Sequence, residues 1–232
     1  MSENIKKIKK TFVVDLNSSE NQSIILKPSA RPFNNQAHQI NEVVKKIYEL
    51  IKDTKHPNDD IILNHSEIKE AFFSPFKPQL KNAQVFLSHS HADKNKALKV
   101  KNYLESRTKH KVFVDSLFWD YKDNVLNELA KYDDTSKIKD AFTLILRESL
   151  QDMIEKCPYF VFLQSNNSVS NQGLSRTTYS AWIYEELKIA HSIRESRLTP
   201  MTESWQVSHD ISPFLESLET ITLKELSRII NS

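Results

Sequence analysis

The stretch Tyr159–Leu163, with the sequence YFVFL, is an unbroken apolar run, which is typical of a strand buried on both faces of a sheet. Two shorter runs of this kind precede it, at Gln84–Ser88 and Lys111–Asp115. Apolar residues recur at helical spacing between and after these runs. The predicted helices are Ala92–Ser106, Ser136–Lys156, Ser180–Arg194 and Leu223–Ile230, and a weaker strand is predicted at Leu198–Thr202. Strands that alternate with helices predict an α/β fold, with a parallel sheet that has helices on both faces.

The first eighty residues carry weaker and more mixed patterns. Two short β-like runs, Thr11–Leu16 and Ser23–Leu26, come first. An amphipathic helix is predicted at His38–Thr54, and a shorter one at Ser66–Phe73 with Ser66 as its N-cap. A stretch with two prolines follows and indicates a boundary near residue 80. We therefore predict an N-terminal extension over residues 1–80 and an α/β domain over residues 81–232.

The composition excludes several classes of protein. The 232 residues carry a net charge of only +2, so the sequence does not predict a nucleic-acid partner. No apolar run reaches the roughly 18 residues that span a bilayer, so no membrane partner is predicted either. Cys157 is the only cysteine, which excludes an intramolecular disulfide and a cysteine-based zinc site. These features predict a cytoplasmic protein.

Gly173 is the only glycine in the chain. Phosphate-binding loops of the dinucleotide and Walker types need several glycines, because the backbone must approach the phosphate closely. Both loop types are therefore excluded. A nucleotide would have to be held by side chains and by ordinary loops.

Three motifs lie at the ends of the predicted strands and at the start of the helix after the third strand. They are Phe86-Leu87-Ser88-His89-Ser90 with Asp93, then Val112-Phe113-Val114-Asp115, then Ser165 followed by Ser180, Trp182, Glu186 and Leu187. In this order they resemble the Toll/interleukin-1 receptor (TIR) domain family, over about two thirds of the chain. The resemblance implies a flavodoxin-like parallel sheet flanked by helices. In the enzymatic members of this family the glutamate of the third motif cleaves NAD+, and Glu186 is the matching residue.

A carboxylate at Glu186 suits this chemistry. Breaking the nicotinamide–ribose bond develops oxocarbenium character on the sugar, and a nearby anion stabilises that charge. Nicotinamide leaves as a neutral molecule, so no second acid is needed, and NAD+ is the substrate with no further cofactor expected. The adjacent Glu185 points about 100° away on the helix, so we place it on solvent. Without the resemblance, both glutamates would be read as surface charges of an amphipathic helix.

Five further residues are candidate substrate-binding residues: Ser88, His89, Asp115, Trp119 and Trp182. The first three follow strands and are suited to hydrogen bonds with ribose or phosphate, although Asp115 could instead order its own loop. Trp119 is expected in a loop, ahead of a polar insert at Tyr121–Thr135, and would offer an aromatic face to the substrate. Trp182 would either do the same or anchor its helix to the sheet.

The layout most resembles bacterial antiphage TIR proteins of the Thoeris type. That resemblance implies a cyclic ADP-ribose isomer or another ADP-ribose derivative as a signal for a downstream effector. It also implies self-association through TIR surfaces and activation by a phage-derived trigger. The alternative is a non-catalytic assembly module, in which Phe118 and Trp119 would be interface anchors.

A second alternative comes from the first motif. His89, His91 and Asp93 follow a strand at the spacing of a metal-dependent hydrolase site. Lys94, however, stands where that motif has its next histidine, and its charge would oppose a pair of zinc ions. No second group of histidines can be assigned as ligands, so the main prediction includes no metal.

Overall fold

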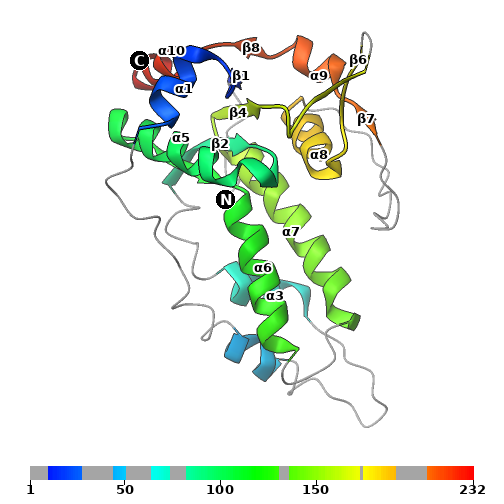
Figure 1. The fold of residues 1–232 in the computed structure, drawn as a ribbon. Helices are drawn as coiled ribbons and strands as arrows, with labels where there is room; N and C mark the ends of the chain where they lie inside the picture. The colour runs from blue at the N-terminus through cyan, green and yellow to red at the C-terminus, as the bar shows by residue number, and fades with distance from the viewer. Residues whose placement is uncertain are drawn as a thin grey trace. The chain divides into compact units, whose positions relative to one another are not determined.

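A computed structural model of the chain describes residues 10–27, 44–50, 64–73, 82–130, 136–172, 175–191 and 208–232. The chain divides into two compact units. The first unit comprises Met1–Pro32, Asn82–Asp115 and Leu150–Ser232, and the second comprises Phe33–Lys81 and Ser116–Ser149. The strands lie in the first unit, and the described part of the second unit is helical (Figure 1).

The first unit is built on a five-stranded sheet in the order β3-β2-β4-β1-β8. The strands are β1 (Lys10–Asp15), β2 (Ala83–Ser88), β3 (Lys111–Val114), β4 (Tyr159–Gln164) and β8 (Glu219–Thr220). Every pairing between neighbours is parallel. β4 lies at the centre, and its residues 160–163 are fully buried, as the apolar run predicts. The predicted α/β fold is confirmed, and the sheet is consistent with a flavodoxin-like arrangement.

The position of β1 differs from the expectation for residues 1–80. β1 pairs with β4 along its whole length, from Lys10 opposite Tyr159 to Asp15 opposite Gln164. On its other side it pairs with β8. Phe12, Val13 and Val14 are buried because both faces of this strand are covered. The sheet therefore takes an inner strand from the stretch that the sequence pattern assigns to an extension.

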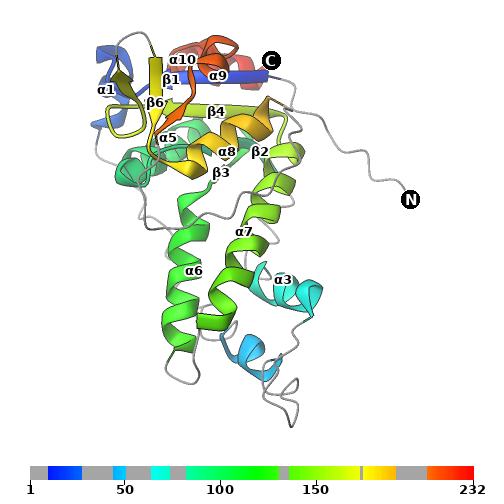
Figure 2. The same ribbon diagram turned by 90° about the vertical axis from the view of Figure 1, so that its right-hand side faces the viewer.

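Helices cover both faces of this sheet. On one face α5 (Lys94–Arg107) packs against α1 (Ser19–Ile25) and α10 (Leu223–Asn231). Figures 1 and 2 agree that α8 (Ala181–Ala190) lies on the opposite face. α1 replaces the strand expected at Ser23–Leu26, because the Ser18 side chain caps a helix there by accepting from the Asn21 amide.

Side chains of α5 close the edge of the sheet at β3. The Val112 amide donates to Glu105 at 3.0 Å, and Lys101 donates to the Val112 carbonyl. Lys101 and Glu105 also pair with each other at 2.8 Å. These contacts satisfy the backbone amide and carbonyl of Val112, which the edge strand would otherwise leave open. They fix β3 to α5, and with it the residue that follows β3, Asp115.

A smaller antiparallel sheet follows β4 in the chain. It comprises β5 (Ser170–Gln172), β6 (Ser175–Thr178) and β7 (His209–Asp210), and β6 packs against α8 and α9 (Ser212–Glu216). The strand expected at Leu198–Thr202 and the last residues of the helix expected to reach Arg194 lie outside the described residues.

The second unit holds helices with an apolar core of their own. They are the helical residues 44–50, α3 (His65–Phe73), α6 (Ser116–Leu129) and the first two thirds of α7 (Ser136–Lys156). The start of α3 is capped by Asn64, which accepts from the amides of Ser66 and Glu67, so the predicted cap at Ser66 is wrong. α6 occupies much of the expected polar insert. Of the helix expected at His38–Thr54, only residues 44–50 are described.

Within the described part of the chain, no helix combines the length and the apolar character needed to cross a membrane.

Candidate functional site

The candidate site lies at the carboxyl edge of the parallel sheet. β2 ends at Ser88, β3 at Val114 and β4 at Gln164, and parallel strands end at the same edge. From β2 the chain goes to β3 on one side, whereas β4 lies on the other side of β2. Open α/β sheets bind ligands where the direction of the connections reverses. The residues after β2, β3 and β4 are therefore the ones to compare with the predictions.

Glu186 reaches this edge from α8. Ser180 caps the helix, since its side chain accepts from the Ile183 amide at 3.3 Å. Ile183, Leu187 and Ala190 form the buried stripe of the helix, and Glu186 lies within that stripe at 1% exposure. The neighbouring Glu185 is half-buried, where full exposure was expected.

The surroundings of Glu186 suppress its negative charge. Burial is the largest cause that raises the pKa of its carboxyl well above the ordinary value, and the charge of Asp115 raises it further. The Ser88 hydroxyl approaches the carboxyl and lowers the pKa in part. Among the described residues, however, no donor reaches either carboxyl oxygen in regular hydrogen-bond geometry. Glu186 therefore keeps its proton at pH values where an exposed glutamate has lost it.

His89 and Asp115 form a buried pair beside Glu186. His89 Nδ1 lies 2.8 Å from Asp115 Oδ1, in an orientation poorer than that of a regular hydrogen bond. Burial lowers the pKa of the His89 imidazole. The charge and contact of Asp115, the Leu87 backbone and the charge of Asp93 raise it, and the net result is a raised pKa. The pair therefore favours a cationic imidazole against a carboxylate.

Four of the six predicted site residues thus come together: Ser88, His89, Asp115 and Glu186. We call these four residues the Glu186 group. All are at most 5% exposed, and they come from β2, the ends of β2 and β3, and α8. A carboxyl in such a low-dielectric setting interacts strongly with any positive charge that develops next to it once it is ionised.

The two tryptophans among the predicted site residues, Trp119 and Trp182, lie in different units of the chain. Trp182 is half-buried in the first turn of α8. Trp119 falls within helix α6, and the prediction that it lies in a loop is wrong. The polar residues after Trp119 continue that helix, because Val125, Leu126 and Leu129 recur at helical spacing and are buried. Trp119 belongs to the second unit, and the Glu186 group belongs to the first.

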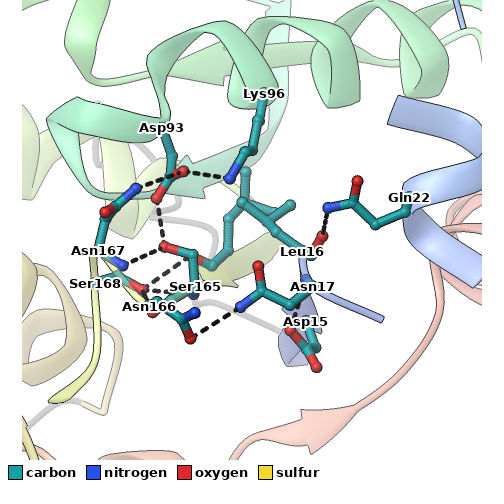
Figure 3. Close-up of polar contacts among 11 residues, drawn as sticks. Asp15, Leu16, Asn17, Gln22, Asp93, Lys96, Ser165, Asn166, Asn167 and Ser168 are labelled. Carbon is teal, nitrogen blue, oxygen red and sulfur yellow. Dashed lines mark hydrogen bonds and ion pairs between the residues drawn. The ribbon is translucent and has the colours of Figure 1, made fainter. Parts of the chain in front are cut away.

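A second polar cluster at the same edge was not predicted as a unit (Figure 3). Asp93, at the start of α5, is 1% exposed and accepts hydrogen bonds from three side chains. Ser165 donates to Oδ2, while Asn167 at 3.1 Å and Lys96 at 2.8 Å donate to Oδ1. Burial raises the pKa of Asp93, but these three donors outweigh it and leave the pKa lowered. We call these four residues the Asp93 cluster.

The Asp93 cluster holds the loop after β4 in place. The Ser165 amide donates to the Ser168 hydroxyl at 2.8 Å, and the Asn167 amide donates to the Ser165 hydroxyl at 3.0 Å. Asn17, after β1, donates to the Asn166 side chain at 3.2 Å. Figure 3 shows these bonds joining the segments after β1, β2 and β4. A serine directly after a buried strand was the only sequence signal for this arrangement.

The structure does not bring the residues of the alternative metal motif together. His91 is exposed, His89 faces Asp115, and Asp93 is bonded to its three donors. Over the described ranges, no group of three or more histidine, cysteine, aspartate or glutamate side chains could hold a metal ion. Cys157 is also buried, and burial raises the pKa of its thiol to about 12, so it is an unreactive core residue.

Comparison with known proteins adds no further guide to function. No family model matches the chain, and no curated protein or solved structure matches it. Function therefore has to be inferred from the geometry of the site and from its motifs.

Proposed function

We propose that this chain cleaves the nicotinamide–ribose bond of NAD+, with Glu186 as the catalytic residue. The observation that supports this most is the buried carboxyl of Glu186, whose pKa is raised among Ser88, His89 and Asp115. A carboxyl placed in an apolar stripe without a regular partner costs stability, and strongly perturbed groups of this kind concentrate at functional sites. Its place at the carboxyl edge of a parallel sheet supports the same reading.

The proposed reaction needs one negative charge and no acid. The bond from ribose C1′ to the pyridinium nitrogen breaks, and its electron pair goes to the nitrogen, so nicotinamide leaves neutral. The ionised Glu186 carboxylate stabilises the positive charge that develops on the ribose. Water then attacks C1′ and loses a proton, which gives ADP-ribose. Attack by a group of the same molecule would give a cyclic product.

The burial of Glu186 implies that catalysis requires a local opening. At 1% exposure its carboxyl cannot touch a substrate in the arrangement described here. An opening that admits NAD+ would also admit water and the positive pyridinium, and both favour the ionised carboxyl. The proposal therefore includes a trigger or self-association that opens the site, as the TIR resemblance implies. The same resemblance extends it to a signal for an effector in antiphage defence.

The test is nicotinamide release from NAD+, measured by chromatography. The purified chain is compared with Glu186→Gln and with Glu185→Gln as the matched control, each alone and with extract from infected cells. We expect release by the wild type and by Glu185→Gln, and a loss of at least about 100-fold in Glu186→Gln. The second product peak identifies hydrolysis or cyclisation. Silence of the wild type under both conditions would reject the enzyme and favour an assembly module.

A further inference from the structure

We propose that His89 is a positioning residue that acts through Asp115, and that the charge of this pair decides whether the neighbouring Glu186 is ionised. The proposal concerns the site of the proposed function and explains how its charge is set. It also changes the role expected for two residues, since the sequence predicts His89 and Asp115 as contacts of ribose or phosphate.

The contact between His89 and Asp115 argues against direct contact of either residue with a substrate. The His89 side chain is 0% exposed and the Asp115 side chain is 7% exposed, and they face each other at 2.8 Å. A substrate would have to separate them to use either one. Their position beside Glu186 leaves them a different role, which is electrostatic.

The charge of the pair has two states. With a proton on His89, the imidazolium balances the Asp115 carboxylate, and the pair is close to neutral. Without that proton, the imidazole no longer offsets the negative charge of Asp115, which then opposes ionisation of Glu186 more strongly, because two like charges repel each other in a low dielectric. Loss of the His89 charge should therefore keep the proton on Glu186, and loss of the Asp115 charge should release it.

Within the described part of the chain, few other charged groups act on the Glu186 group. Asp93 acts on His89 from the start of α5, and its own charge is bound by Lys96. β6 packs against α8 and carries one charged residue, Arg176, which is exposed. His209 of β7 stacks on Tyr184, which lies two residues before Glu186 and so on a roughly opposite side of the helix. His89 and Asp115 are therefore the groups to change.

The test titrates Glu186 directly in the full chain. Infrared spectroscopy follows the absorption of protonated carboxyl groups against pH, and the band lost in Glu186→Gln identifies this residue. We expect His89→Gln to move the midpoint of Glu186 to higher pH by about one unit or more, and Asp115→Asn to move it to lower pH by a similar amount. Circular dichroism confirms that each variant is folded.

A purely structural role would not move the midpoint in opposite directions. An unchanged midpoint in either folded variant, or shifts of the same sign, would overturn the proposal, and either variant decides the matter if the other fails to fold. Where NAD+ is cleaved, the acidic limb of the kcat/KM profile should move with the same two signs. If the midpoint of Glu186 shifts in opposite directions in the two variants but the chain cleaves no NAD+, the role of the pair is supported. Only the proposed function is then rejected.

Discussion

Two buried carboxyl groups lie at the same edge of one sheet, and their surroundings shift their pKa values in opposite directions. Asp93 accepts from three donors, and its pKa is lowered. Glu186 has no regular donor among the described residues, and its pKa is raised. Both residues are 1% exposed. Three donors outweigh the effect of burial on the pKa of Asp93, whereas the charge of Asp115 adds to the effect of burial on the pKa of Glu186.

The contrast separates a group that stabilises the fold from one that weakens it. A carboxylate with full hydrogen bonding joins neighbouring loops and contributes to stability. A carboxyl without such bonds costs stability, and proteins keep such groups where function requires them. Under the proposed function, Asp93 stabilises the fold and Glu186 serves the chemistry. Four predictions test that assignment.

Removal of the Asp93 side chain should have the largest effect. Asp93→Ala leaves the Ser165 hydroxyl, the Asn167 amide and Lys96 without their shared acceptor. We expect a loss of about 2–3 kcal/mol in the free energy of unfolding. This is less than the loss on breaking a fully buried ion pair, because the Lys96 side chain is 37% exposed. Urea unfolding measures it. A loss below about 0.5 kcal/mol would mean that the Asp93 cluster does not hold the loops.

Replacement of the Glu186 carboxyl should have an effect of the opposite sign. Glu186→Gln keeps the size of the side chain and supplies an amide donor toward Asp115. We expect a gain of about 1–2 kcal/mol in the free energy of unfolding at neutral pH, together with the loss of catalysis. The same urea experiment applies, with Glu185→Gln as the control. Destabilisation by this variant would show that Glu186 is a structural residue after all.

The pH dependence should also distinguish the two carboxyls. The raised pKa of Glu186 stabilises the fold below the unfolded value near 4.5, and this contribution is lost as pH rises through the raised folded pKa. The advantage of Glu186→Gln should therefore grow above pH 4.5, by at most about 1.4 kcal/mol per pH unit. Because the pKa of Asp93 is lowered in the fold, its carboxylate contributes stability above pH 3.8, and this contribution is lost as the pH falls through the lowered pKa. The free energy of unfolding of Asp93→Asn should therefore approach that of the wild type only in acid.

Two serines give the smallest and most closely matched test. Ser165→Ala removes a donor to Asp93 and should cost about 1 kcal/mol of unfolding free energy. Ser88→Ala removes a hydroxyl that has no regular hydrogen bond to Glu186, and should cost no more than about 0.5 kcal/mol. Thermal unfolding measures both losses. Equal losses of stability in the two variants would mean that the surroundings of Asp93 and of Glu186 do not differ as described.

Local patterns predicted the elements that surround the site. The buried runs of β2, β3 and β4 and the long helix α7 follow from apolar spacing that extends over only a few residues. Ser180 was expected to open its helix, and it caps α8. Helix α6 was missed because its buried Val125, Leu126 and Leu129 stand among polar residues, so this part of the sequence resembles a polar insert. The carboxyl edge of the sheet, and the residues that follow its strands, could be named in advance.

The contacts between distant segments could not be predicted. Nothing near Asp93 indicates that Ser165, 72 residues later, donates to it. The pairing of His89 with Asp115 is hidden for the same reason, because each follows a different strand and both look like free polar residues. Residues after parallel strands converge, but their partners depend on how the side chains pack. The division into a satisfied and an unsatisfied carboxyl therefore appears only in three dimensions.

The position of β1 has a consequence for the chain as it is synthesised. Its register pairs each residue with one in β4 that lies 149 positions later, as for Lys10 and Tyr159 at the starts of the two strands. At about 5–20 residues per second, the ribosome needs roughly 7–30 s to deliver that partner after β1 has been made. During this interval an apolar strand destined for the interior has no sheet to join. Such a segment is a natural client for chaperones that hold nascent chains, and completion of the sheet waits on the last strands to emerge.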